Sequence, residues 1–315
     1  MSIIDTLSAG FRAVSRRLWL IAVPVLLDLY LWLGPKLSIR PMVEQMVALF
    51  RNMMATASVP PVDGSADAIA MVELMLHTFE ETLGSINLFA LLAWGRIGVP
   101  SMTGVAFIPE NARWVIEISG YGQVLAAQLL LLGIGLLVAC VYLTMLADTL
   151  RVDSGDSVFT RFQVLMRRVP AYWLHLAIIF VPLSMLFIFT LSVGMLLGPL
   201  SVFVAVGVLW AMLFLAFVPQ AVVLAEHRPL MALWSSVAIV RINFWSTLGI
   251  VLLVNVIAAG LGLIWNQLLL GSAAGTLLAI LANAYVGTGL TMALFIFYRD
   301  RIVMLRQRLE EQRSI

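Results

Sequence analysis

Three polar residues stand inside long apolar stretches, and they are the first candidates for chemistry. Asp28 lies in the run Leu18–Leu33, and Asn255 and Asn283 lie in two later runs. An ionisable residue within a membrane span usually pairs with another polar group or marks an ion or proton pathway. At about 1.5 Å per helical residue, all three positions fall near the middle of a membrane. We expect them to form an intramembrane cluster of Asp28, Asn255 and Asn283, where the first, fifth and sixth spans meet.

Three interpretations of this cluster stand side by side. It is a structural knot that satisfies a buried carboxylate, or a proton or ion site, or a place where Asp28 faces a partner subunit. Small residues recur every fourth position at Gly275, Ala279, Asn283 and Gly287. Such a ridge favours close contact between helices in a membrane, so it predicts tight packing around Asn283.

The composition sets the class of protein. Of the 315 residues 62% are hydrophobic and 11% charged, with a formal net charge of +2. Ordinary soluble domains carry roughly a quarter charged residues, so a soluble enzyme and a nucleic-acid-binding protein are excluded. Cys140 is the only cysteine, which excludes an internal disulfide and a thiolate metal site. No hydrolase, metalloprotease or nucleotide-binding motif occurs in a suitable context, so we expect no enzymatic activity, no cofactor and no bound metal ion.

Six apolar runs are predicted to cross the membrane, each near the roughly 20 residues that a span requires. Arginines concentrate in the segments that face inward when the N-terminus is cytoplasmic. We therefore expect a single integral membrane domain over residues 1–315, in a bacterial inner membrane, with both termini cytoplasmic and a charged tail at 299–315. The runs are Leu18–Leu33, Gln123–Leu146, Tyr172–Leu197, Ser201–Leu224, Trp245–Ile264 and Ala274–Tyr298.

A basic amphipathic segment precedes each odd-numbered span. These segments cover residues 4–19, 157–168 and 230–241, and each carries an aromatic residue about two turns before an arginine. Helices of this kind lie in the membrane interface with their apolar face toward the acyl chains. The predicted fold is therefore all-α and polytopic. It has six transmembrane helices arranged as three hairpins, each preceded by a cytoplasmic interfacial helix.

The third of these units carries a family resemblance. Ala232, Ser236, Arg241 and Trp245 fit a pattern in which a helix with A-x-x-x-S and R-x-x-x-W enters a span. The segment resembles part of bacterial six-span membrane proteins of unknown function, including the membrane domain attached to some glycerophosphodiester phosphodiesterases. The resemblance implies a membrane domain without the catalytic phosphodiesterase portion, and it lends no functional residues.

Residues 40–120 form the one sizeable loop, predicted on the outer side. Apolar stripes at helical spacing over 41–57 and 66–83, with turn residues at 59–64 between them, predict a helical hairpin. Residues 88–104 are expected to dip into the outer interface or to re-enter the membrane. Thioethers at i, i+4 spacing with His77 nearby would suit Cu(I), but flexible apolar packing is the favoured interpretation. The possible hydrophobic binding face consists of Met42, Met46, Phe50, Met53, Met71 and Met75.

These features favour a non-enzymatic role in binding or assembly. The expected protein is an accessory, scaffold or assembly subunit that contacts the lipid bilayer, other membrane proteins or a second copy of itself, and no nucleic acid. The alternative is a small transporter or channel that uses Asp28 as its ion or proton site. The third and fourth spans are almost purely apolar, which disfavours a wide aqueous path and leaves lipid handling open.

Overall fold

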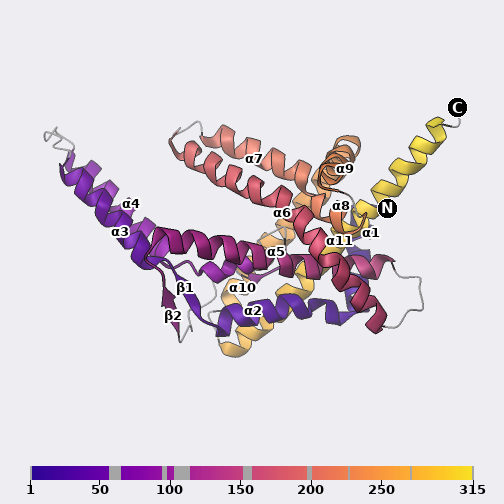
Figure 1. The fold of residues 1–315 in the computed structure, drawn as a ribbon, viewed down its shortest axis with the longest axis horizontal. Coiled ribbons are helices and arrows are strands. Elements are labelled where there is room, and N and C mark those ends of the chain that lie inside the picture. Colours follow the sequence, from indigo (N-terminus) through magenta and orange to yellow (C-terminus); the bar gives the residue numbers. More distant parts are fainter. Residues whose placement is uncertain are drawn as a thin grey trace. The chain divides into compact units, whose positions relative to one another are not determined.

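The computed structural model describes residues 2–56, 65–93, 98–102, 114–151, 158–196, 201–225, 228–269 and 272–313, and they are helical almost throughout (Figure 1). The chain forms two compact units. Unit 1 comprises Met1–Asp28, Ala93–Pro109 and Gly135–Ile315, and unit 2 comprises Leu29–Leu92 and Glu110–Ile134. The predicted all-α class is confirmed.

Short elements dominate the first third of the chain and long helices the rest (Figure 1). The first group is α1 (Ile3–Ser15), the 3-10 helix η1 (Leu18–Ile21), α2 (Ala22–Leu33), β1 (Lys36–Ser38), α3 (Arg40–Thr56), α4 (Ser65–Gly84), the 3-10 helix η2 (Leu88–Ala93) and β2 (Val115–Glu117). The second group is α5 (Tyr121–Arg151), α6 (Val158–Leu196), α7 (Ser201–Leu215), α8 (Val218–Val223), α9 (Pro229–Ile242), α10 (Phe244–Leu269) and α11 (Ala273–Arg313).

Five helical stretches among the described residues are long and apolar enough to cross a membrane. They lie in α5, α6, α7 with α8, α10 and α11, and they correspond to the second to sixth predicted spans. The first predicted span, Leu18–Leu33, is apolar but shorter, because it divides into a 3-10 turn and the twelve residues of α2. The protein is therefore a multi-pass membrane protein by helix length and composition, with five candidate spans in the described part of the chain.

The three predicted approach segments differ in the structure. The first and third form separate helices, α1 and α9, and α9 ends at Ile242, after which the backbone leaves helical geometry at Asn243. Residues 158–168 of the second segment are the beginning of α6, a continuous helix of 39 residues that runs through Pro170 and Pro182. The second segment is therefore joined to its span without a break.

Helix α1 packs against α11 within unit 1. Thr6, Gly10 and Val14 form its buried stripe. A Cβ atom on Gly10 would lie 2.6 Å from the carbonyl oxygen of Gly289, so only glycine allows this approach. The Ser15 and Tyr285 hydroxyls are 2.8 Å apart. The buried side of α1 thus contacts protein, whereas the sequence suggested that it would face acyl chains.

The fourth predicted span is interrupted. Helix α7 ends at Leu215 and α8 begins at Val218, after two intervening residues, with Pro219 in its first turn. Ser236 of α9 bridges the interruption: its hydroxyl donates to the carbonyl of Phe214 at 2.7 Å and accepts from the N–H of Phe217 at 3.2 Å. The backbone therefore breaks just before Pro219.

The C-terminal end of α8 is satisfied by a second side chain. All six α8 residues are buried, so the terminal carbonyls need a partner from the protein. Arg151, the last residue of α5, donates to the carbonyls of Val223 at 2.6 Å and Leu224 at 3.0 Å. A cation at this end also interacts favourably with the helix dipole.

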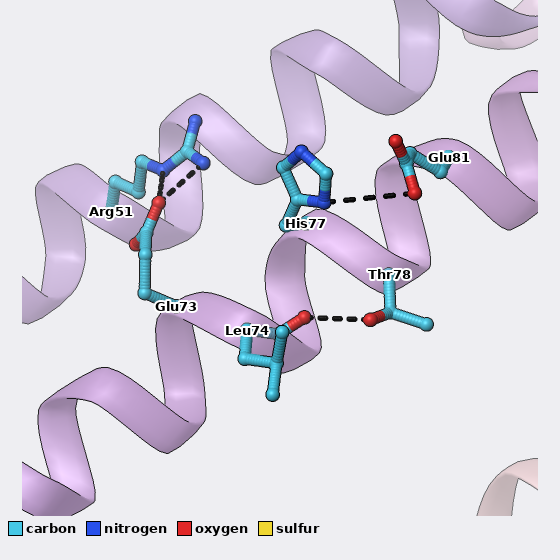
Figure 2. Close-up of polar contacts among 6 residues, drawn as sticks. All are labelled: Arg51, Glu73, Leu74, His77, Thr78 and Glu81. Atoms are coloured by element: carbon cyan, nitrogen blue, oxygen red, sulfur yellow. Dashed lines mark hydrogen bonds and ion pairs between the residues drawn. The ribbon is translucent and has the colours of Figure 1, made fainter.

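Unit 2 contains a small sheet and a helical hairpin. Strands β1 and β2 pair in parallel, and the side chain of Asn87 accepts from the N–H of Leu37 at 3.1 Å. Helices α3 and α4 pack side by side, joined by two hydrogen bonds from Arg51 to Glu73 at 2.6 and 3.0 Å (Figure 2). The predicted turn at 59–64 lies outside the described residues.

The close approach of α1 to α11 is testable by adding one methyl group. Gly10→Ala is expected to lower the free energy of unfolding by about 1–3 kcal/mol, because the new Cβ overlaps the backbone of α11. Thermal unfolding in detergent measures the loss. Gly260→Ala is the control: a Cβ there meets no atom within 4 Å, so stability should stay equal or rise slightly. Equal effects of both substitutions would contradict the packing.

Candidate functional site

Asp28 lies near the middle of α2 and is fully buried. It shares its side of the helix with the buried residues Leu27 and Leu31, while Leu26 and Tyr30 are exposed. An ionised carboxylate in such surroundings is stable only when hydrogen bonds replace the water that it loses. The position of Asp28 therefore depends on donors from other segments.

These donors come from two distant parts of the chain. The Ser101 hydroxyl donates to one carboxylate oxygen of Asp28. The backbone N–H of Met102 points at both oxygens, at 3.1 and 3.0 Å. The side chain of Asn283 in α11 faces the same carboxylate. Its Nδ2 atom is buried and makes no full hydrogen bond to a described residue. All of these residues belong to unit 1.

The segment that carries Ser101 and Met102 is irregular and buried. The N–H of Val99 donates to the carbonyl of Ala93 at 3.1 Å, and both Val99 and Met102 are inaccessible to solvent. Pro100 lies directly on Gly287 of α11, so that a side chain at Gly287 would collide with the proline ring. The small ridge of α11 thus contacts this segment as well as neighbouring helices. Residues 94–97 and 103–104, also within the predicted dip, lie outside the described residues.

Asn255 occupies a different environment from the other two predicted cluster residues. Its side-chain amide donates to the carbonyl of Val251, one turn earlier in α10, at 2.7 Å. Among the described residues, the hydrogen-bonding groups that act on Asp28 belong to Ser101, Met102 and Asn283. The structure therefore brings together two of the three predicted residues, Asp28 and Asn283.

Sequence reasoning missed Ser101 and Met102. They lie more than 70 residues after Asp28, in a segment with no helical or strand periodicity. One signal could have suggested the contact. A carboxylate in the middle of a span needs hydrogen-bond donors, and the glycine- and proline-rich segment around Val99 was expected to approach the membrane and could supply them.

Hydrogen bonds and polar contacts of Asp28 connect three segments of the chain, and we call this set of contacts the polar latch. Its hydrogen-bond donors are the Ser101 hydroxyl and the Met102 N–H, and the Asn283 carboxamide faces the same carboxylate; all three groups are neutral. Protonation would turn one carboxylate oxygen into an O–H donor and so change the pattern of hydrogen bonds with Ser101 and Met102. The site can therefore hold α2, residues 98–102 and α11 together, and it can respond to the arrival of a proton.

The predicted hydrophobic face on the outer loop is divided. Met42 and Met46 are half-buried in the N-terminal half of α3, next in sequence to the buried residues Val43 and Val47. The other four predicted residues are exposed, and Leu49, Met54 and Leu74 extend the same region. We call this set the methionine-rich surface; it consists of Leu49, Phe50, Met53, Met54, Met71, Leu74 and Met75.

Polar contacts on the hairpin do not assemble a metal centre. His77 Nδ1 lies 3.7 Å from Glu81 Oε2, one turn along α4 (Figure 2). No group of three histidine, cysteine, aspartate or glutamate side chains converges within the described part of the chain. The exposed hydrogen bond to Glu73 raises the pKa of Arg51 above its ordinary value, so this guanidinium stays charged. The ligands of the Cu(I) hypothesis would be methionine thioethers, and that hypothesis stays a prediction.

Comparison with known proteins finds no relatives: no protein-family model matches the chain, and no curated protein or solved structure matches it significantly. The resemblance of the segment from Pro229 to Val256 to six-span membrane proteins stays a prediction. Two residues of the pattern that carries this resemblance have a physical role in the structure. Ala232 and Ser236 lie on the buried side of α9, and Ser236 bridges the interruption between α7 and α8.

A double-mutant cycle on Asp28→Asn and Asn283→Ala tests the latch. Asp28→Asn replaces one acceptor oxygen with an NH2 group, and each buried donor that loses its acceptor costs about 1–3 kcal/mol. Because the two side chains face each other, the losses of thermal stability in detergent should be non-additive by at least about 0.5 kcal/mol.

The matched cycle pairs Asp28→Asn with Asn255→Ala. Asn255 bonds within its own helix, so these two effects should add to within about 0.5 kcal/mol. Additivity in the first cycle, or coupling as large in the second, would contradict the described geometry.

Proposed function

We propose that this protein is a non-enzymatic, multi-pass assembly or accessory subunit of a bacterial inner membrane, which binds another membrane protein through the α3–α4 hairpin. The observation that carries the proposal is the methionine-rich surface. Phe50, Met53, Met71 and Met75 keep 51%, 59%, 67% and 64% of their surface exposed. Several large apolar side chains exposed on two helices that pack side by side are typical of interaction sites.

The hairpin cannot cover this surface by itself. Two helices bury only the sides that face each other, and on α4 these sides carry the half-buried residues Val72 and Leu76. Met71, Leu74 and Met75 fall on other sides of the same helix and stay exposed. A third element must therefore cover them for their apolar area to leave water.

The chemistry of the surface favours a protein partner. Methionine side chains are flexible and polarisable, so they adapt to the shape of a facing apolar surface. The exposed ion pair of Arg51 and Glu73 joins α3 to α4 and adds polar groups to the same part of the hairpin (Figure 2). Protein interfaces combine apolar side chains with polar groups that form hydrogen bonds. The bilayer surrounds the apolar helices, and both termini are proposed to be cytoplasmic.

Placing a charge on the methionine-rich surface is the direct test. Met53→Glu and Met71→Glu should each reduce stoichiometric copurification of the partner at least tenfold, because an unpaired carboxylate buried at an interface costs several kcal/mol. Tagged protein purified in gentle detergent and analysed by native mass spectrometry provides the measurement.

Gln45→Glu is the matched control, since it adds the same charge at an exposed site on α3 outside the methionine-rich surface. It should leave the complex intact. The proposal is refuted if the partner still copurifies with both methionine variants. It is also refuted if the wild-type protein always purifies without a stoichiometric partner.

One observation favours the alternative function of a small transporter. Asp28 is bound by the irregular segment 98–102, and transporters build their binding sites from interrupted segments of this kind. If Asp28 carries protons, liposomes containing the protein should dissipate a pH gradient and Asp28→Asn should abolish that flux. Wild-type liposomes as tight as protein-free liposomes would eliminate this function.

A further inference from the structure

An apolar groove lies between α6, α7 and α9 in unit 1. Its volume is about 370 Å³, at the lower end of the usual range for small-ligand sites. Leu215 of α7 closes one side of it. The two main walls carry Ile178, Pro182 and Leu183 from α6, and Pro229, Leu230 and Leu233 from α9.

The lining allows only an apolar occupant. None of the groove's side chains carries a hydrogen-bonding group. Pro182 and Pro229 also lack a backbone N–H, so these positions offer no donor. A polar ligand would lose its hydration here without gaining partners, whereas a hydrocarbon chain would gain contacts.

A single flexible acyl chain is narrow enough to lie along a groove of about 370 Å³. Helices α6 and α7, which contribute to its lining, are among the candidate membrane spans, so acyl chains of the bilayer can reach this surface.

A positive charge stands at the end of the groove where α9 begins. Arg228 immediately precedes Pro229 and is exposed. On the same helix, Leu230 and Trp234 keep 74% and 71% of their surface exposed, so apolar surface continues from the groove to the outside of the helix. Trp side chains of this kind are frequent at the level of lipid headgroups. A hydrocarbon slot beside a cation is complementary to a lipid with an anionic headgroup.

We propose that this groove binds one acyl chain of an anionic phospholipid whose phosphate pairs with Arg228. The site is independent of the α3–α4 hairpin and of Asp28. It gives the protein a preference among lipids, which general solvation of apolar helices by the bilayer does not provide.

Native mass spectrometry with defined lipids tests the site. Dioleoyl phosphatidylglycerol, which is anionic, should be retained by the detergent-purified full-length protein more than dioleoyl phosphatidylcholine, which is zwitterionic. Arg228→Gln should lower phosphatidylglycerol retention about fivefold, the effect of one interfacial arginine. Arg241→Gln, an exposed arginine in the last turn of the same helix, should leave retention unchanged.

Filling the groove supplies a second, independent arm. Leu183→Trp should displace the lipid by occupying its volume; if that variant does not fold, Leu230→Gln alters an exposed wall residue with little risk to folding. The proposal is overturned if both arginine variants lose lipid equally, or if the filled groove retains phosphatidylglycerol like the wild type. A groove variant that changes the oligomeric state while keeping its lipid would also overturn it, since a second copy would then be the occupant.

Discussion

Polar groups buried in an apolar interior must find partners within the protein, and much of unit 1 is arranged around this requirement. The interruption before α8 leaves backbone groups without helical partners, and Ser236 and Arg151 supply them at opposite ends of that short helix. The carboxylate of Asp28 is handled in the same way by Ser101 and Met102. In hydrocarbon each unsatisfied group costs several kcal/mol, so these few side chains constrain where α5, α9 and residues 98–102 can lie.

Helix α11 is the element that the others share. More than half of its apolar window is buried, whereas each of the other four candidate spans is at most one-third buried. Gly287 and Gly289 let Pro100 and Phe11 approach the backbone of α11. One turn before Gly287, the side-chain amide of Asn283 faces Asp28. Small residues and one polar residue on the same helix thus serve packing and polar satisfaction together, as is common between membrane helices.

The sequence predicted the long elements better than the site. Five apolar runs became candidate spans, because hydrophobic length alone identifies such helices. The shared environment of Asp28 and Asn283 was also anticipated from polarity and depth. Ser101 and Met102 were not, because an irregular segment leaves no periodic signal for a contact more than 70 residues away. The close packing of α1 was missed as well, since Gly10 reads as a weak helix former until the facing glycine on α11 is known.

The order of these contacts along the chain has a consequence for biosynthesis. Helix α1 and Asp28 are made well before α11, which both of them contact; Asn283 follows Asp28 by 255 residues. At about 5–20 residues per second, the ribosome takes roughly 10–50 s to bridge that interval. During this time the carboxylate and the glycine face of α1 await their final neighbours. The nascent chain therefore needs water, lipid headgroups or the insertion machinery as temporary partners. The packing of unit 1 is completed only when α11 has been inserted.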